Sequence, residues 1–380
     1  MNEGYRTLFL QTKNGELQTP FFMPDATRAT VRGMTTQSIE ETGIEALVVN
    51  TYHLLLQPGS EIIEDLKGIH AFMRWDKPIL SDSGGYQVYS LIHKNPEMGY
   101  VTEEEVVFFS PLDGKEYRLT PERSIAIQFE LGVDMMVCLD DPRPNTATKE
   151  DIDRAVERSI RWAVRCKEEY KRQIKERGLG EKEKPLLFGV VQGGPYKDLR
   201  KRSADALVEI SFDGYGFGAR HVDEKGVFME EIMAYTASLL PEDVPHFALG
   251  VGTPFDIVRS YLLGWDMFDC VIPTREGRHG RIFRYTQEEK ECSLEDMAGK
   301  SFWYETINIR KKENKEEKNC IEKNCNCHAC ANGYSLAYIR HLFRVGESLG
   351  PQLLSAHNLH FYARLMKKIK DRRKGEGLAL

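Results

Sequence analysis

An acid and a dense group of bases lie close together in residues 264–281, GWDMFDCVIPTREGRHGR. The apolar first half carries Asp269, and a Pro-Thr pair then leads into a basic loop. A carboxylate is a poor partner for phosphate but a good nucleophile at an electron-poor sugar carbon. The stretch therefore favours either chemistry on an anionic polymer or a buried strand whose acid caps the next turn. The loop carries four basic residues within seven positions: Arg275, Arg278, His279 and Arg281.

Further acids and an amide follow other short apolar runs. Asp82 opens the sequence DSGGYQ, Asp140 follows DMMVCL, and Gln192 stands in VQGG. Two carboxyl groups suit transfer at a glycosidic bond, one as nucleophile and the other as proton donor and acceptor. A carboxylate and an amide can read the edge of a planar base, and Tyr86 offers a face for stacking. Each acid taken singly is more simply a turn cap, so only convergence on one face supports a site.

Residues 325–330 read Cys-Asn-Cys-His-Ala-Cys, a CxCxxC motif. Three thiolates and a later imidazole form a closed tetrahedral set, so we expect a structural zinc. His357 is the best candidate for the imidazole, because His328 lies inside the cluster and would be strained. His341 and His360 fall within helical patterns, and Cys320 is a spare thiol or a substitute ligand. The predicted zinc ligands are Cys325, Cys327, Cys330 and His357.

These residues need a scaffold that brings them to one face. Short apolar runs alternate with amphipathic helical stretches that begin at capping residues, which predicts parallel βαβ units. There are eight such runs, the number that closes an α/β TIM (β/α)8 barrel, and no GxGxxG loop follows the first, which argues against a doubly wound open sheet. In a barrel the active site forms at the C-terminal ends of the strands, where these acids and the amide stand. The predicted strands are residues 20–25, 46–50, 78–81, 134–139, 186–191, 214–218, 246–251 and 268–272.

The predicted catalytic barrel occupies residues 1–300, with a hairpin insertion near 93–117 that turns at Asp113 and Gly114. Residues 301–380 are predicted to form a zinc-binding subdomain that ends in a basic helix. The net charge of −6 argues against a globally basic nucleic-acid coat but allows local basic patches. No run reaches the length of a membrane span and the N-terminus lacks the apolar core of a signal peptide, so we expect no membrane partner and a cytoplasmic enzyme.

Six motifs follow one another along the chain: DSGGYQ (82–87), TPE (120–122), VQGG (191–194), GVGTP (250–254), DMFDCVIPTR (266–275) and CxCxxC…HN (325–358). In this order they resemble the tRNA-guanine transglycosylases, also called queuine tRNA-ribosyltransferases, over nearly the whole chain. The resemblance implies base exchange without strand cleavage. Guanine at the wobble position (34) of the tRNAs for Asn, Asp, His and Tyr is flipped out and replaced by a 7-deazaguanine. Because the appended RNA-binding domain of the archaeal enzymes is not found, the chain is similar to the bacterial enzyme or the eukaryotic catalytic subunit.

The resemblance also implies a role for each matching residue. Asp269 corresponds to the nucleophile that forms a covalent ribosyl intermediate, and Asp82 corresponds to the general acid and base. Asp140, Gln192 and the backbone of Gly218 correspond to the groups that recognise the base. Four further sets are implied: Tyr86 and Leu249 at the base faces, Ala219 and Arg220 beside its 7-substituent, Arg275, Arg278 and Arg281 on the backbone of the tRNA anticodon stem-loop, and Cys325, Cys327, Cys330 and His357 on zinc.

The chain departs from the family pattern beside the expected pocket for the 7-substituent. Where bacterial members usually read GGLxVGE, residues 218–224 read GARHVDE. An inward-pointing Arg220 would repel the aminomethyl cation of preQ1, whereas Asp223 or His221 could hydrogen-bond a diol. The departure favours direct use of queuine, with preQ1 as the alternative.

Two other classes of function fit part of the pattern. A barrel glycoside hydrolase shares the two carboxylates but needs neither the zinc unit nor the arginine loop. A zinc-containing RNA-binding scaffold without catalysis uses the zinc unit and the arginines but not Asp269. The resemblance further suggests a homodimer.

Overall fold

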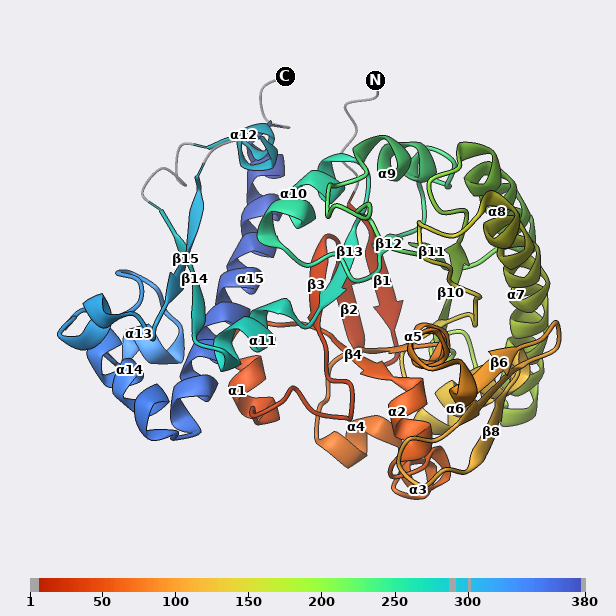
Figure 1. The fold of residues 1–380 in the computed structure, drawn as a ribbon, viewed down its shortest axis with the longest axis horizontal. Helices are drawn as coiled ribbons and strands as arrows, with labels where there is room; N and C mark the ends of the chain where they lie inside the picture. The colour runs from red at the N-terminus through yellow and green to blue at the C-terminus, as the bar shows by residue number, and fades with distance from the viewer. Residues whose placement is uncertain (1–6, 287–291, 300–301, 377–380) are drawn as a thin grey trace.

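The computed structural model describes residues 7–286, 292–299 and 302–376 (Figure 1). Its centre is a parallel sheet of eight strands in the order β3-β13-β12-β11-β10-β9-β5-β4. A parallel bridge between Asp25 and Val48 joins the two ends of this sheet, and the Ala26 N–H donates to the Val48 carbonyl at 2.7 Å. The predicted (β/α)8 barrel is therefore confirmed. Its strands are β3 (Phe21–Pro24), β4 (Leu47–Asn50), β5 (Ile79–Asp82), β9 (Met135–Val137), β10 (Leu186–Val191), β11 (Gly214–Phe217), β12 (His246–Ala248) and β13 (Met267–Cys270).

Apolar side chains fill the barrel. Alternate residues of the strands, such as Phe188 and Val190 on β10, form one buried cluster with Met135 and Met267 from other strands. The hairpin of β1 (Phe9–Thr12) and β2 (Gly15–Gln18), which precedes β3, adds Leu10 and Leu17 to the same cluster. A larger cluster lies between the strands and the surrounding helices. The interior is thus packed, and polar chemistry is confined to the ends of the strands.

Helices surround the barrel, and several start as their sequences predict. The side chains of Thr120, Thr148 and Thr253 cap α6, α7 and α10 by accepting a backbone N–H three residues on. The helices are α1 (Thr36–Glu40), α2 (Thr51–Leu56), α3 (Ser60–Asp65), α4 (Gly68–Met73), α5 (Gly85–Lys94), α6 (Pro121–Leu131), α7 (Lys149–Arg177), α8 (Lys197–Ile210), α9 (Glu230–Ala237), α10 (Pro254–Leu262), α11 (Ile272–Arg278) and α12 (Leu294–Ala298).

The predicted hairpin insertion is a larger element in the structure. Strands β6 (Gly99–Val101), β7 (Val106–Phe109) and β8 (Glu116–Leu119) form a three-stranded antiparallel sheet, preceded by a 3₁₀ turn, η1 (Pro96–Met98). The turn at residues 113–114 lies between β7 and β8, as expected. Glycine is required at Gly99, where a Cβ would lie 2.2 Å from the Val107 carbonyl oxygen.

A second unit lies beside the barrel. The long helix α15 (Leu349–Glu376) packs against α11 and β3, with β14 (Arg281–Tyr285), β15 (Tyr304–Asn308), α13 (His328–Ala331) and α14 (Leu336–Val345) on its far side (Figure 1). The expected boundary at residues 300–301 lies outside the described residues. Strand β14, which precedes that boundary, pairs antiparallel with β15, which follows it. In the described part of the chain, no helix is long and apolar enough to span a membrane.

Candidate active site and metal centre

Four neighbouring strands end in polar residues at the C-terminal mouth of the barrel. In spatial order, β13 carries Asp269, β3 leads into Asp25, β4 ends in Asn50, and β5 ends in Asp82. The register pairs Asn50 with Asp82, and Asp269 with Met23 two residues before Asp25. The structure therefore brings both predicted catalytic acids to one arc of the mouth.

Asp82 is held by its neighbours on β4 and in the loop after β5. Its Oδ1 accepts hydrogen bonds from the N–H groups of Thr51 at 3.1 Å and Gly84 at 3.0 Å, and its Oδ2 accepts one from Nδ2 of Asn50. Burial raises the pKa of Asp82 to about 7, opposed by the two N–H donors and reinforced by the charges of Asp25 and Asp269. A carboxyl group with this pKa can give and take a proton at neutral pH.

Asp269 has fewer hydrogen-bond partners. Its Oδ1 accepts the backbone N–H of Gly250 at 2.7 Å, in a loop that turns through a left-handed conformation at that glycine (φ +70°). Burial raises the pKa of Asp269 to about 7, while the Gly250 N–H lowers it and the charge of Asp25 raises it. With one oxygen held by a single donor, the other can approach an electrophilic carbon.

Asp140 and Gln192 lie on the other side of the mouth, after β9 and β10. Nε2 of Gln192 donates to Oδ2 of Asp140 at 2.6 Å, and burial raises the pKa of Asp140 to about 7 against that donor. Gly218, after β11, lies so close that a Cβ would be 2.4 Å from Nε2 of Gln192. The structure thus brings together the three groups predicted to read a base.

A buried arginine, which the sequence reasoning missed, supports this side of the mouth. Arg200 on α8 has no exposed surface and donates to the carbonyl oxygens of Gly194 at 3.0 Å, Val191 at 2.7 Å and Gly218 at 3.0 Å. Its guanidinium also lies over the ring of Phe217, and burial lowers its pKa to about 9. The one available signal is its place on the buried face of α8, which also holds Leu199, Ser203, Ala204 and Leu207.

The other predicted pocket residues lie around these groups. Tyr86 is 54% exposed on α5, and Leu249 is half-buried and faces Gly216 on β11, where a Cβ would meet its Cδ1 at 2.5 Å. Ala219 is half-buried and takes a left-handed conformation (φ +67°), and Arg220 is exposed.

The segment after Arg220 is tied to itself and to the loop before α7. Nδ2 of Asn145 donates to the carbonyl oxygens of Arg220 and Val222, at 3.0 Å each. Oδ1 of Asp223 accepts the N–H groups of Lys225 and Val227 at 2.8 Å. That oxygen of Asp223 is therefore used inside its own turn rather than held free for a ligand.

The predicted basic loop is wrong in one respect, because Arg275 and Arg278 lie on helix α11. They are three residues apart and share one side of that helix, and Arg281 begins β14. Arg275 and Arg281 are 49% and 60% exposed and flank Glu276. Nε of Arg275 lies 3.6 Å from Oε1 of Glu276, and Nη1 of Arg281 lies 3.2 Å from Oε2 of Glu276. Arg278 is half-buried, and burial together with Arg32 and Arg275 lowers its pKa, while Asp25 raises it.

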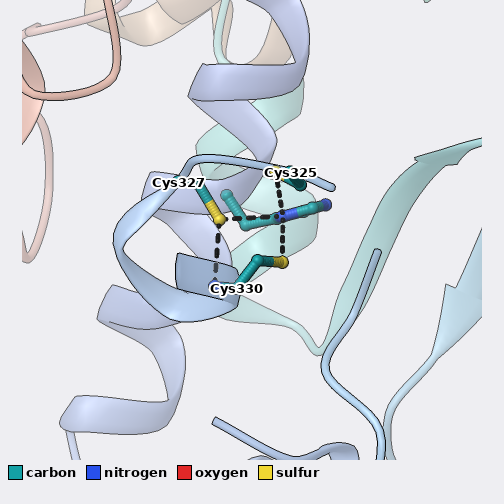
Figure 2. Close-up of side chains that lie close together, drawn as sticks. Cys325, Cys327 and Cys330 are labelled. Carbon is teal, nitrogen blue, oxygen red and sulfur yellow. Dashed lines mark hydrogen bonds between the residues drawn. The ribbon is translucent and has the colours of Figure 1, made fainter. Parts of the chain in front are cut away.

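The four predicted zinc ligands converge beside α15, and Figure 2 shows the three cysteine side chains around one point. Nδ1 of His357 lies 3.8, 3.2 and 3.7 Å from the sulfur atoms of Cys325, Cys327 and Cys330. A tetrahedral zinc site has nitrogen–sulfur edges of about 3.5 Å. Nε2 of His357 donates to the Phe283 carbonyl at 2.8 Å, which leaves Nδ1 free to coordinate.

The donor set therefore fits a metal such as zinc, and His357 lies within α15, as His360 does. All four side chains are buried in the second unit. A closed set of three sulfur atoms and one nitrogen leaves no position for a substrate, so such a metal would stabilise the fold.

The fold and the site define a (β/α)8-barrel enzyme with a second unit whose Cys3His cluster could bind a metal such as zinc. The family model for queuine tRNA-ribosyltransferase matches residues 2–376. The queuine tRNA-ribosyltransferase of Halothermothrix orenii is 40% identical over 369 residues, covering 97% of this chain and 90% of that protein. Those of Zymomonas mobilis and Rickettsia rickettsii are 42% and 41% identical over 366 and 365 residues, covering 96% of this chain and 88% and 92% of theirs. The chain belongs to the queuine tRNA-ribosyltransferase family and is a pentosyltransferase.

Proposed function

We propose that this enzyme exchanges guanine at the wobble position (34) of the GUN-anticodon tRNAs for Asn, Asp, His and Tyr for a 7-deazaguanine, through a covalent bond between the ribose and Asp269. The observation that carries this proposal is the pair of acids Asp82 and Asp269 in one arc of the mouth, each with a pKa of about 7. At neutral pH such a pair can hold one proton between them, which is what displacement at a sugar carbon requires.

The exchange takes two balanced steps. In the first, an oxygen of Asp269 attacks C1′ of the nucleotide, the bond between C1′ and the base nitrogen breaks, and Asp82 protonates the leaving guanine. In the second, Asp82 takes a proton from the incoming base, whose nitrogen attacks C1′ and releases Asp269. The sugar–phosphate chain is not broken in either step.

Base recognition falls to the opposite side of the mouth. The ionised carboxylate of Asp140 accepts from the ring N–H and amino group of guanine, while Gln192 and the backbone of Gly218 contact its carbonyl edge. Tyr86 and Leu249 cover the base faces. The contact between Gln192 and Asp140 supports this assignment, because it aligns two of these groups before a base binds.

The incoming base in this proposal is queuine, taken up directly. Arg220 follows the pocket residues Gly218 and Ala219, and its positive charge would disfavour the aminomethyl cation of preQ1. The test compares the rates at which queuine and preQ1 enter a GUN-anticodon tRNA. Much faster incorporation of preQ1 would contradict this choice and leave the rest of the proposal standing.

The tRNA anticodon stem-loop would lie across α11, where Arg275, Arg278 and Arg281 offer positive charge to its phosphates.

The cluster of Cys325, Cys327, Cys330 and His357 would hold one structural zinc. Exposed apolar side chains support a homodimer, because burial in an interface would remove them from water: Ile62, Leu66 and Phe72 on and beside α3 and α4, and Tyr338 and Val345 on α14. A tRNA substrate implies action in the cytoplasm.

The decisive experiment measures incorporation of radiolabelled guanine into tRNA by the wild type, Asp269→Asn and Asp82→Asn. We expect at least a thousandfold loss for each variant, since each removes a group that acts only in the reaction. Denaturing electrophoresis should show a tRNA adduct with the wild type and none with Asp269→Asn. Equal exchange by the wild type and Asp269→Asn would refute the assignment of the nucleophile and favour an RNA-binding scaffold.

A further inference from the structure

A third carboxylate, Asp25, lies in the same arc as the two acids of the proposed reaction. It follows β3, which is the barrel strand between β13 with Asp269 and β4 with Asn50. Its backbone bridges to Val48 where the barrel closes. The charge of Asp25 raises the pKa values of Asp82 and Asp269, so its carboxylate is near both groups.

One carboxylate oxygen of Asp25 accepts hydrogen bonds within the protein, and the other can accept one from a ligand. Its Oδ1 accepts hydrogen bonds from the backbone N–H of Thr27 at 2.7 Å and from the Thr27 hydroxyl. Among the residues that the structure describes, Oδ2 has no hydrogen-bond partner, and the side chain is half-buried. An ionised carboxylate only accepts hydrogen bonds, so this oxygen needs a donor from a ligand or from water.

The order of the strands around the barrel indicates which part of a bound nucleotide would lie near Asp25. In the ring of eight strands, β3 is four places from β10, which carries Gln192, and is therefore across the barrel from it. A base held by Asp140, Gln192 and Gly218 thus lies away from β3. The sugar must reach Asp269 on β13, the immediate neighbour of β3, so Asp25 lies on the sugar side of the mouth.

Under the proposed function, the hydrogen-bond donors that a nucleotide offers on that side are its sugar hydroxyls. Asp269 attacks C1′, and the 2′-hydroxyl is on the adjacent carbon. We propose that Oδ2 of Asp25 accepts a hydrogen bond from the 2′-hydroxyl of the nucleotide whose base is exchanged, and that this contact makes the enzyme select a ribonucleotide over a deoxyribonucleotide. This inference rests on the proposed function, because it takes Asp269 as the nucleophile.

The physical effect of the contact follows from its charge. A hydrogen bond from a neutral hydroxyl to a carboxylate is stronger than one between neutral groups. Contacts to the 2-hydroxyl strengthen in the transition state of glycosyl transfer, where positive charge develops on the ring. The contact should therefore raise kcat as well as lower KM. The 2′-hydroxyl is also the group by which a protein distinguishes RNA from DNA at a single nucleotide.

The test uses two anticodon stem-loop RNAs that differ only at the target nucleotide, which is guanosine in one and 2′-deoxyguanosine in the other. We expect the wild-type kcat/KM for guanine exchange to fall roughly 10- to 100-fold on the deoxy substrate. In Asp25→Ser, the hydroxyl can still accept the Thr27 N–H but cannot reach the sugar. We therefore expect the kcat/KM of this variant to differ by less than about threefold between the two RNAs. Asp25→Asn keeps the size of the side chain, and its preference for the guanosine RNA should lie between those of the wild type and Asp25→Ser.

The control is Asp205→Asn, which removes an exposed acid paired with Lys201 on the outer helix α8 and should keep the wild-type ratio. Two results overturn the inference. Either the wild type exchanges both substrates equally well, or Asp25→Ser keeps the full preference for guanosine. If the wild type exchanges guanine in neither RNA, the proposed function itself fails, so the two failures are distinct.

Discussion

Nε2 of Gln192 donates a hydrogen bond to Oδ2 of Asp140 at 2.6 Å, joining the ends of the adjacent strands β10 and β9. This donor stabilises the ionised form of Asp140, whereas burial raises its pKa to about 7. Under the proposed function, only the ionised form accepts from both donors of a guanine edge, so the amide would help to keep Asp140 ready to bind. Gly218 leaves space for this contact, because a Cβ there would lie 2.4 Å from Nε2.

Gly218→Ala should therefore damage base binding more than stability. Gly218 does not have a positive φ, but a Cβ there would lie 2.4 Å from Nε2 of Gln192 and 2.9 Å from the Val191 carbonyl oxygen, so the new methyl group must displace the Gln192 amide and shift the backbone slightly. We expect the KM for guanine to rise roughly tenfold or more, the effect of losing about one charge-assisted hydrogen bond. Exchange kinetics at several guanine concentrations measure this, together with thermal unfolding. The control is Gly180→Ala, where the nearest atom is 3.5 Å away. An unchanged KM in Gly218→Ala would show that this pair does not read the base.

Asp269→Asn should stabilise the protein at alkaline pH. The pKa of Asp269 is about 7 in the folded chain, mainly through burial, against an ordinary value of 3.8. The folded state binds the proton more tightly than the unfolded chain does. The free energy of unfolding therefore falls as the pH rises from about 3.8 to about 7, and the full loss is reached above about pH 7. A shift of this size would be about 4 kcal/mol if the group were fully buried, but the side chain is partly exposed at the mouth. We therefore expect a gain of about 1–2 kcal/mol at pH 8 and almost none at about pH 3, below the ordinary value of 3.8.

Urea unfolding at the two pH values measures this difference. Asp205→Asn, on the exposed face of α8, serves as the control and should show no gain at pH 8. An equal effect of Asp269→Asn at both pH values would mean that no buried charge is relieved. The result also bears on function, because a carboxylate that destabilises the fold is retained for its chemistry.

The barrel could be predicted because its strands are short apolar runs with clear limits. The ends of helix α6 follow from its local sequence, because Pro121 suits a first helical turn and Gly132 takes the left-handed conformation that ends a helix. Helix α11 was predicted as a loop, because its sequence contains Pro273 and Gly277. Pro273 lies in the first turn, where no N–H is needed, and a Cβ on Gly277 would meet the backbone of Ser355 at 2.7 Å. Only the packing of α15 on α11 explains this glycine, and the sequence does not show that packing.

Only those residues of the candidate site that stand at the ends of predicted strands could be recognised as site candidates from the sequence. Asp82, Asp140, Gln192 and Asp269 end strands, so the barrel pattern alone brings them to one mouth. Asp25 and Asn50 also end predicted strands, but nothing in their local sequence separates them from turn caps, and only the spatial order of strands puts them between the two acids. Arg200 lies on a helix, and its role depends on three carbonyl groups that the fold brings together.

Replacing one cysteine of the cluster should remove the metal and destabilise the second unit. We expect the wild type to contain one zinc per chain and Cys330→Ser to contain little, with a loss of at least about 3 kcal/mol because metal binding is coupled to folding. Cys320→Ser is the matched control: its sulfur donates to the Glu322 carbonyl at 3.5 Å and lies outside the set of four ligands. Metal analysis and thermal unfolding give the result. Loss of zinc in Cys320→Ser, or its retention in Cys330→Ser, would contradict the ligand assignment.

Opposite charge changes on one turn of α11 should move tRNA affinity in opposite directions. Arg275 and Arg281 flank Glu276, which competes with phosphate for both. Arg275→Gln should weaken binding and lower the slope of log Kd against log salt concentration by about one, the value of one lost phosphate contact. Glu276→Gln should tighten binding, because it frees both arginines.

Fluorescence anisotropy with a labelled anticodon stem-loop between 50 and 300 mM KCl measures both changes. Arg172→Gln, on the outer face of α7 where Glu169 and Glu176 already neutralise the arginine, should leave affinity and slope unaltered. If Arg275→Gln and Arg172→Gln gave the same slope as the wild type, α11 would not be the face that binds RNA. The salt dependence is more informative than affinity alone, because a local disturbance of α11 would weaken binding without changing the number of counterions released.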